Sequence, residues 1–220
     1  TQYISAAGSA GLSAQKAMSI AEELYTTGYI TYPRTDNTVY PDDLDPRELL
    51  GEFTEHYLFG DDAESLLAVE EIEPTAGDEE TTDHPPIHPT GEIPARDDLS
   101  DDEWDVYELV VRRFFATVAD PAEWEHLKVV ADANGCLLKA NGKRLVEAGY
   151  HDVYPYRSTS ENHVPDVEEG EILGIEDARI EAKQTQPPRR RGQSRLIEEL
   201  ESRGLGTKST RHHTIEKLYD

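Results

Sequence analysis

A chain of 220 residues is long enough to bury a core, and it allows one domain or two. The formal net charge is −25, from 46 acidic and 21 basic residues, which on bulk charge alone argues against a nucleic-acid partner. One cysteine excludes a disulfide framework and a four-cysteine zinc site, and no apolar run approaches the ~20 residues of a membrane helix. We therefore expect a soluble, cytoplasmic protein without a membrane partner.

Two amphipathic helices are predicted in the first half of the chain. Ser13 is a candidate N-cap for apolar positions with helical spacing, and Gly28 stands where that helix would end. Ser100 and Glu103 form a capping-box pattern before a second helix, which Pro121 closes. We expect both apolar stripes to pack into a core.

The segment GYITYPRTDN, residues 28–37, separates the first helix from an acidic stretch. It is predicted as a short strand that ends at Pro33, with Tyr32 at its exposed end. A phenol with a pKa of ~10 needs a nearby cation to attack phosphate at neutral pH, and Arg34 could supply that charge and bind a phosphate oxygen. These residues alone favour the simpler interpretation, a strand-end aromatic with a half-buried ring.

Charge is distributed unevenly along the chain. Residues 42–103 contain 22 acidic and two basic residues, which is typical of proteins from salt-loving organisms. An acidic, partly disordered insert around residues 60–83 is the alternative, and both interpretations can hold together. Residues 183–217 contain nine basic and four acidic residues, so a basic surface is concentrated near the C-terminus.

The second half of the chain changes from strand-like to helical patterns. Residues 124–182 contain the runs HLKVVA, GCLLKA and EILGIEDARI, separated by turn signals, and are predicted to be β-rich. Ser194 opens a third helix through Arg203, and a fourth begins near Ser209 or Thr210. The predicted fold class is α+β.

Three motifs occur in the order found in one enzyme family. Residues 28–37 resemble the ITY-x-R-TD-S signature of type IA DNA topoisomerases, and DHPPIHPT (83–90) resembles the family's His-x-x-Ile-x-Pro-Thr segment. Residues 187–220 resemble the PPPRY block that leads into LE-x-x-G-(I/L)-G. The chain is identified as a member of this family, most like its archaeal members. Asn37 replaces the usual serine, and Arg190 stands where an aromatic residue is common, which leaves one DNA contact in doubt.

The resemblance implies a multi-domain fragment. Its expected parts are the end of the first half of a β-rich arch (1–9), a mainly helical tyrosine domain (10–115), the arch or hinge domain (116–182) and the start of a helical single-strand DNA-binding domain (183–220). Nothing like the family's metal-binding Toprim domain precedes Thr1. We expect that domain to be an intrachain partner in a complete, monomeric enzyme and to bind Mg²⁺, so the isolated fragment would be inactive.

No metal site is expected within the chain itself. The run DLDPRE, residues 43–48, has the spacing of Toprim carboxylates, but its prolines make a polar turn rather than the end of a buried strand. His84 and His88 are four residues apart, but the prolines between them forbid the helix of a zinc pair. His88 is predicted to be a core or loop histidine.

The resemblance also implies roles for residues of the site. Tyr32 would attack one DNA strand to form a 5′-phosphotyrosine link, allowing strand passage and ATP-independent relaxation of negative supercoils. Arg34 would clamp the scissile phosphate, and His84 would hydrogen-bond a phosphate or orient its surroundings. We expect Tyr32 to be largely exposed, with Arg34 close by and His84 within one side chain's reach.

DNA-binding residues are expected mainly around the third and fourth helices. Two glycines would let the backbone approach DNA, and a helix N-terminus with flanking cations would bind phosphate. The alternative for this turn is an ordinary capped connection, and His212 and His213 are expected to be only solvent-exposed. The predicted contacts are Arg189, Arg195, Gly204, Gly206, Lys208, Ser209, Thr210 and Arg211.

Two other functions remain open from the sequence. The chain could be a catalytically inactive fragment that binds single-stranded DNA, which formation of a covalent adduct would distinguish. It could also be an acidic interaction protein with chance motifs, which a lack of single-strand binding would favour.

Overall fold

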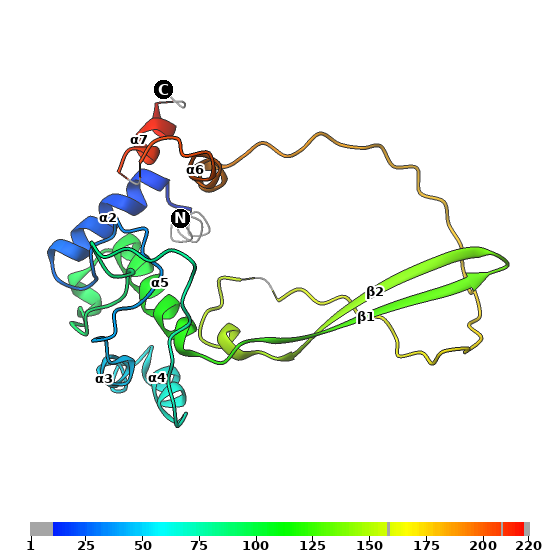
Figure 1. The fold of residues 1–220 in the computed structure, drawn as a ribbon, viewed down its shortest axis with the longest axis horizontal. Helices are drawn as coiled ribbons and strands as arrows, with labels where there is room; N and C mark the ends of the chain where they lie inside the picture. Colours follow the sequence, from blue (N-terminus) through cyan, green and yellow to red (C-terminus); the bar gives the residue numbers. More distant parts are fainter. Residues whose placement is uncertain (1–10, 158, 208, 218–220) are drawn as a thin grey trace. The chain divides into compact units, whose positions relative to one another are not determined.

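A computed structural model describes residues 11–157, 159–207 and 209–217. The described chain forms two compact units (Figure 1). The first contains residues 11–121, 149–157 and 191–217, and the second contains 122–148 and 159–190. Helices together with a two-stranded antiparallel sheet agree with the predicted α+β class.

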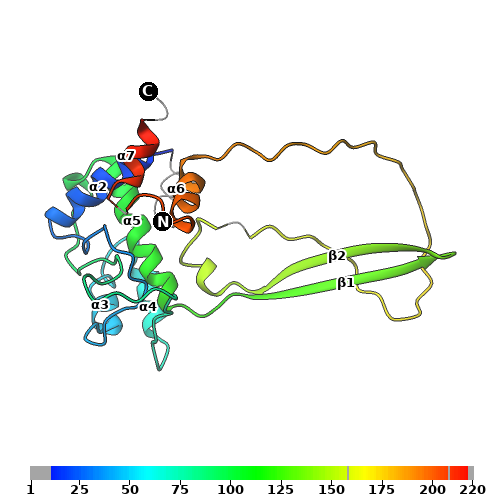
Figure 2. The ribbon, with the colours of Figure 1, turned by 45° about the horizontal axis from the view of Figure 1, so that its top comes forward.

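Helices make up the regular structure of the first unit. In chain order its elements are α2 (Ala14–Thr26), α3 (Pro46–Gly51), α4 (Gly60–Leu67), η1 (Arg96–Asp98), α5 (Asp101–Val118), η2 (Gly149–His151), α6 (Gln193–Ser202) and α7 (Arg211–Glu216). Figures 1 and 2 both show α2 and α5 side by side, which is the contact that organises the core.

Local signals fix both ends of α2 as predicted. The Ser13 hydroxyl accepts a hydrogen bond from the Lys16 amide. At the other end, Gly28 has φ +89° and its amide donates to the Tyr25 carbonyl, while the Tyr29 amide donates to the Leu24 carbonyl. This pair of bonds is a Schellman motif, which requires the left-handed conformation that glycine adopts most easily. Gly28 thereby sets the direction in which the chain leaves the helix.

The predicted capping box of α5 is confirmed. The Ser100 hydroxyl accepts from the Glu103 amide, and the Glu103 carboxylate accepts from the Ser100 amide. The helix ends at Val118, before Pro121. Its buried face joins a core rich in aromatic rings from several helices, and the largest fully buried side chains are Tyr107, Phe53, Phe59, Phe114 and Phe115.

A β-hairpin is the regular structure of the second unit. Strands β1 (Glu123–Ala133) and β2 (Cys136–Glu147) pair antiparallel, and Ala133 is opposite Cys136. Asn134 and Gly135 form the turn with φ of +55° and +84°, as an Asn-Gly turn of type I′ requires. The two neighbouring hydrophobic runs from the sequence therefore pair with each other.

The third predicted strand of this region, EILGIEDARI, is wrong. Residues 171–190 carry no helix or strand in the structure. The side chains of Ile172 and Ile180 are 95% and 100% exposed. Apolar alternation alone cannot hold a strand, because the backbone amides and carbonyls also need a neighbouring strand as partner.

Two unit boundaries differ from the expected domains. Residues 149–157 leave the expected arch of 116–182 and belong to the first unit, where Val153 and Tyr154 are buried. Helices α6 and α7 also belong to the first unit, through a cluster of Ala14, Ile197 and Ile215. Two short helices bury too little apolar surface to form a core alone, so they pack on α2 instead.

Candidate active site

The segment that carries Tyr32 is held by one neighbouring segment rather than by a sheet. The predicted strand is wrong, because Ile30 and Pro89 form only an isolated β-bridge. The Thr31 amide donates to the His88 carbonyl, and the Thr31 hydroxyl accepts from the His88 amide at 3.0 Å and donates to the Pro86 carbonyl at 2.9 Å. The two motifs are thus joined at the residue before Tyr32.

Two aromatic rings hold the ring of Tyr32. The His84 ring lies 4.5 Å from it between centroids, and the Tyr25 ring lies 5.2 Å away in an edge-on arrangement. The expected proximity of His84 to Tyr32 is confirmed. The expectation of a largely exposed Tyr32 is wrong, because these rings leave it half-buried. Its hydroxyl makes no hydrogen bond within the described residues, which leaves the oxygen available for chemistry.

Arg34 is engaged by a carboxylate that sequence reasoning missed. Its Nε donates to Glu22 Oε1 at 2.6 Å, and its Nη2 forms an ion pair with the same oxygen. Glu22 lies three residues before Tyr25 on α2 and therefore shares its helix face. That spacing was the available signal. The bond links the cation of the site to the same helix that supplies the Tyr25 ring.

Asn37 fastens the second motif to the first. Its side-chain amide donates to the Thr81 carbonyl at 2.8 Å and the His84 carbonyl at 3.0 Å, and the Thr35 hydroxyl donates to the same His84 carbonyl. One residue on, the Thr38 hydroxyl donates to the Glu79 carbonyl and accepts from the Glu79 amide. The departure from the family serine therefore has a structural role, since an amide has two donors to offer.

His88 is a core residue, in agreement with the sequence prediction. It is buried, and its Nδ1 lies 2.7 Å from the Pro89 carbonyl oxygen. Its ring packs against Tyr40 and Phe114. Burial lowers the pKa of His88, so the ring is neutral in the core at neutral pH.

His212 contradicts the expectation that it is solvent-exposed, whereas His213 is exposed. The side chain of His212 is buried. It belongs to α7, which packs on α2 (Figure 2). Burial lowers the pKa of His212, and the positive charge of Arg34 opposes its protonation further, while Glu22 favours protonation. Packing of α7 on α2 therefore brings a C-terminal histidine within electrostatic range of Arg34 and Glu22, which the linear sequence did not indicate.

The connection between α6 and α7 is tied by its own hydrogen bonds. Gly204 and Gly206 have φ of +65° and +67°, and the Thr207 amide donates to the Thr210 hydroxyl at 2.9 Å. The Arg211 guanidinium donates to Glu201 and to the Leu205 carbonyl. These bonds agree with the alternative of an ordinary inter-helix turn.

The other predicted DNA contacts lie in both units. Arg195 is exposed on α6 and Ser209 is half-buried beside α7, whereas Arg189 is exposed in the second unit. Lys208 lies outside the described residues. The structure groups Tyr32 and His84 and links Arg34 to α2, the helix whose Tyr25 ring contacts Tyr32, whereas the predicted DNA contacts are divided between the two units.

Comparison with known proteins decides the family. A family model described as DNA topoisomerase matches residues 1–220, the whole chain. The chain belongs to the type IA DNA topoisomerases. It is 49% identical to DNA topoisomerase 1 of Archaeoglobus fulgidus over 207 residues, and 34% identical to DNA topoisomerase 3-alpha of Arabidopsis thaliana over 212 residues. These alignments cover 94% and 95% of the chain but 31% and 23% of the relatives, so the chain spans under a third of their length.

A solved structure supports the same assignment for the fold. The full-length topoisomerase I of Thermotoga maritima matches with a TM-score of 0.66 and 27% sequence identity. The match covers 94% of this chain and 34% of that one. Within the described part of this topoisomerase chain, no helix is long and apolar enough to cross a membrane.

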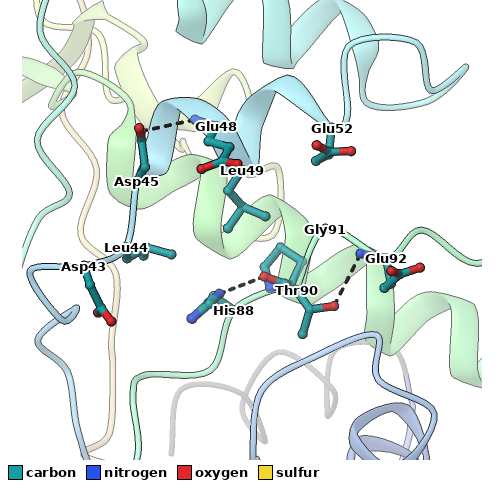
Figure 3. Close-up of a pocket in the computed structure, with 11 residues that line it drawn as sticks. Asp43, Leu44, Asp45, Glu48, Leu49, Glu52, His88, Thr90, Gly91 and Glu92 are labelled. Atoms are coloured by element: carbon teal, nitrogen blue, oxygen red, sulfur yellow. Dashed lines mark hydrogen bonds between the residues drawn. The ribbon is translucent and has the colours of Figure 1, made fainter.

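An acidic cavity lies in the first unit of the topoisomerase chain, apart from Tyr32 (Figure 3). It has a volume of about 410 Å³ and is lined by α3, the residues before it and the segment around His88. Asp45 is occupied as the N-cap of α3, because its carboxylate accepts from the Arg47 and Glu48 amides. No group of three His, Cys, Asp or Glu side chains among the described residues could hold a metal ion.

Proposed function

We propose that this chain supplies the nucleophile of a DNA topoisomerase that cuts one strand. The phenolic oxygen of Tyr32 forms a bond to phosphorus while the bond from phosphorus to the 3′-oxygen breaks. The phenol loses its proton and the leaving oxygen gains one, so a 5′-phosphotyrosine link and a free 3′-hydroxyl result. The observation that carries this proposal is a tyrosine whose ring contacts two neighbouring rings and whose hydroxyl makes no hydrogen bond to the residues that the structure describes.

Arg34 and His84 act on the phosphate in this proposal. The planar guanidinium of Arg34 can bind a non-bridging oxygen, where negative charge builds up in the transition state. His84 is exposed and its ring is against that of Tyr32, so it can reach the same phosphate or keep the phenol oriented. Both residues therefore act on the phosphate that Tyr32 attacks.

The link conserves the energy of the phosphodiester bond. The 3′-hydroxyl can attack phosphorus after another strand has passed, which restores the DNA and releases Tyr32. ATP is therefore not required, and negative supercoils are relaxed. We propose that the complete protein is a cytoplasmic monomer acting on single-stranded DNA, with Mg²⁺ held by a Toprim domain elsewhere in the chain.

The polarity of the adduct tests this function. Single-stranded DNA labelled at either end is incubated with the complete protein and Mg²⁺, and the reaction is stopped with denaturant. Protein should retain the label of the 3′-terminal fragment, because Tyr32 holds the 5′-phosphate of that piece. Retention of the fragment from the 5′ end would contradict the proposal, as would the absence of any adduct.

We also propose that the C-terminal basic stretch binds single strands with few of its cations. The 183–217 stretch has nine basic residues, and nine neutralised phosphates would give a slope of log affinity against log salt of about −6. Among the described residues of this stretch, four are in ion pairs with glutamates, namely Lys183, Arg191, Arg203 and Arg211. If the other five cations, Lys208 included, all contact phosphates, the slope is no steeper than about −3.5, and backbone and stacking contacts supply the rest of the affinity.

Fluorescence anisotropy of a labelled oligonucleotide at several KCl concentrations measures this slope. Glu199→Gln provides a matched variant, because Glu199 pairs with both Arg191 and Arg203. Releasing these cations should steepen the slope. A slope near −6 in the unsubstituted chain would contradict the expectation.

A further inference from the structure

The guanidinium of Arg34 is bound along one edge. Nε and Nη2 both face Glu22 Oε1, while Nη1 has no partner among the described residues. The two side chains are 27% and 39% exposed, so the pair lies at the surface without being fully solvated. A guanidinium held in this way keeps donors on its opposite side for another anion.

One face of α2 carries the two residues that contact Arg34 and Tyr32. Glu22 binds Arg34, and Tyr25, one helical turn further on, packs on the ring of Tyr32. Arg34 and Tyr32 are separated by Pro33 alone, whose ring fixes φ of the intervening residue. The same short stretch of helix therefore restrains the cation and the nucleophile together.

A third element packs on the helix that carries Glu22. Helix α7 contacts α2 through Ala14 and Ile215, and His212 of α7 is buried. Burial lowers the pKa of His212, and the positive charge of Arg34 lowers it further while the negative charge of Glu22 raises it.

We propose that Glu22 is a positioning residue for strand cleavage and rejoining, which orients Arg34 so that its free Nη1 edge meets the scissile phosphate. This inference rests on the proposed function of Tyr32 and Arg34. Glu22 itself does not touch the DNA. Its negative charge also weakens the general attraction of Arg34 for phosphates. The ion pair therefore improves the orientation of Arg34 at the scissile phosphate at the expense of overall DNA affinity.

The physical distinction lies between rate and affinity. Removing the carboxylate leaves Arg34 charged but free to rotate, so its contribution to transition-state binding falls while its long-range attraction for DNA rises. Misplacement of a catalytic group by about 1 Å can lower a rate about 100-fold. Glu22→Ala should therefore slow cleavage at least about 10-fold, with single-strand affinity unchanged or modestly higher.

A double-mutant cycle in the complete protein tests this coupling. Single-turnover rates of adduct formation and single-strand affinities are measured for Glu22→Ala, Glu22→Gln, Arg34→Ala and the Glu22→Ala/Arg34→Ala pair. Glutamine can still accept the Nε hydrogen bond, so Glu22→Gln should recover most of the rate. In the Arg34→Ala background, Glu22→Ala should have no further effect, because it acts through Arg34.

Glu23→Ala is the matched control, since it removes the same charge from an exposed position of the same helix. It should leave the rate unchanged, and thermal melting of every variant checks folding. An equal loss of rate from Glu22→Ala with and without Arg34 would overturn the inference. So would an unchanged rate in Glu22→Ala, or a Glu22→Gln variant as slow as Glu22→Ala.

Adduct formation by the unsubstituted protein distinguishes failure of this inference from failure of the proposed function. If Glu22 has no positioning role, adduct still forms on Tyr32 and only the Glu22 variants behave differently from expectation. If the function is wrong, the unsubstituted protein forms no adduct through Tyr32 at all. The same gel assay separates these outcomes.

Discussion

Tyr32→Phe in the complete protein is expected to abolish the covalent DNA adduct and to leave single-strand affinity within a few-fold. The phenylalanine ring can keep the contacts with Tyr25 and His84, and only the nucleophilic oxygen is lost. Because that oxygen makes no hydrogen bond in the described structure, its removal leaves no buried partner unsatisfied. Loss of the adduct should therefore occur without loss of the fold.

Denaturing gels with labelled DNA measure the adduct, and anisotropy measures the affinity. Tyr57→Phe is a matched control, because this tyrosine is 74% exposed and loses the same hydroxyl. It should form adduct at the unsubstituted rate. Adduct at that rate in Tyr32→Phe would exclude Tyr32 as nucleophile, and peptide mapping would then show whether the neighbouring Tyr25 carries the DNA.

Phe115→Ala is expected to lower the free energy of unfolding by about 3–5 kcal/mol, the usual cost of deleting a large buried aromatic side chain. Phe115 is fully buried on α5, and its ring contacts Phe53, Phe59 and Phe114. The cavity left behind would lie beneath the helix that packs on α2. Loss of stability at this position would therefore also loosen the support of Tyr25 and Glu22.

Urea unfolding of the 220-residue chain, followed by far-ultraviolet circular dichroism, measures the change. Leu137→Ala is the control, because Leu137 is 63% exposed on β2 and its truncation should change stability by about 0.5 kcal/mol or less. Equal effects of the two substitutions would show that the buried aromatic cluster does not stabilise the first unit.

Features with local causes were predictable from the sequence. The caps at Ser13, Gly28 and Ser100 act within one helical turn, and the Asn134-Gly135 turn acts between adjacent strands. Hydrophobic residues at helical spacing, together with a capping residue at the end, specify a helix without reference to the rest of the chain.

Other features depended on partners that are distant in sequence. Residues 28–33 have strand-like composition, but the structure offers them one bridge at Pro89 rather than a neighbouring strand. The electrostatic effect of Arg34 and Glu22 on His212 depends on how α7 packs on α2, two helices at opposite ends of the chain. No local pattern encodes that packing. The helical spacing of Glu22 and Tyr25 could have shown that they share a face, but it was not used.

The hydrogen bonds of Asn37 and Thr38 to Thr81, His84 and Glu79 close a long, strongly acidic excursion of the chain at its base. Within it, α3, α4 and their connection supply core residues such as Leu50, Phe53 and Phe59, whereas residues 68–74 are mostly exposed. The entropy of closing a flexible loop grows only slowly with length, so residues added or removed within 68–74 change the cost of closure little. Selection can thus adjust the surface charge and length of this stretch without displacing Tyr32. Because these few bonds hold the base of the excursion, its acidic surface can change while the position of Tyr32 stays the same.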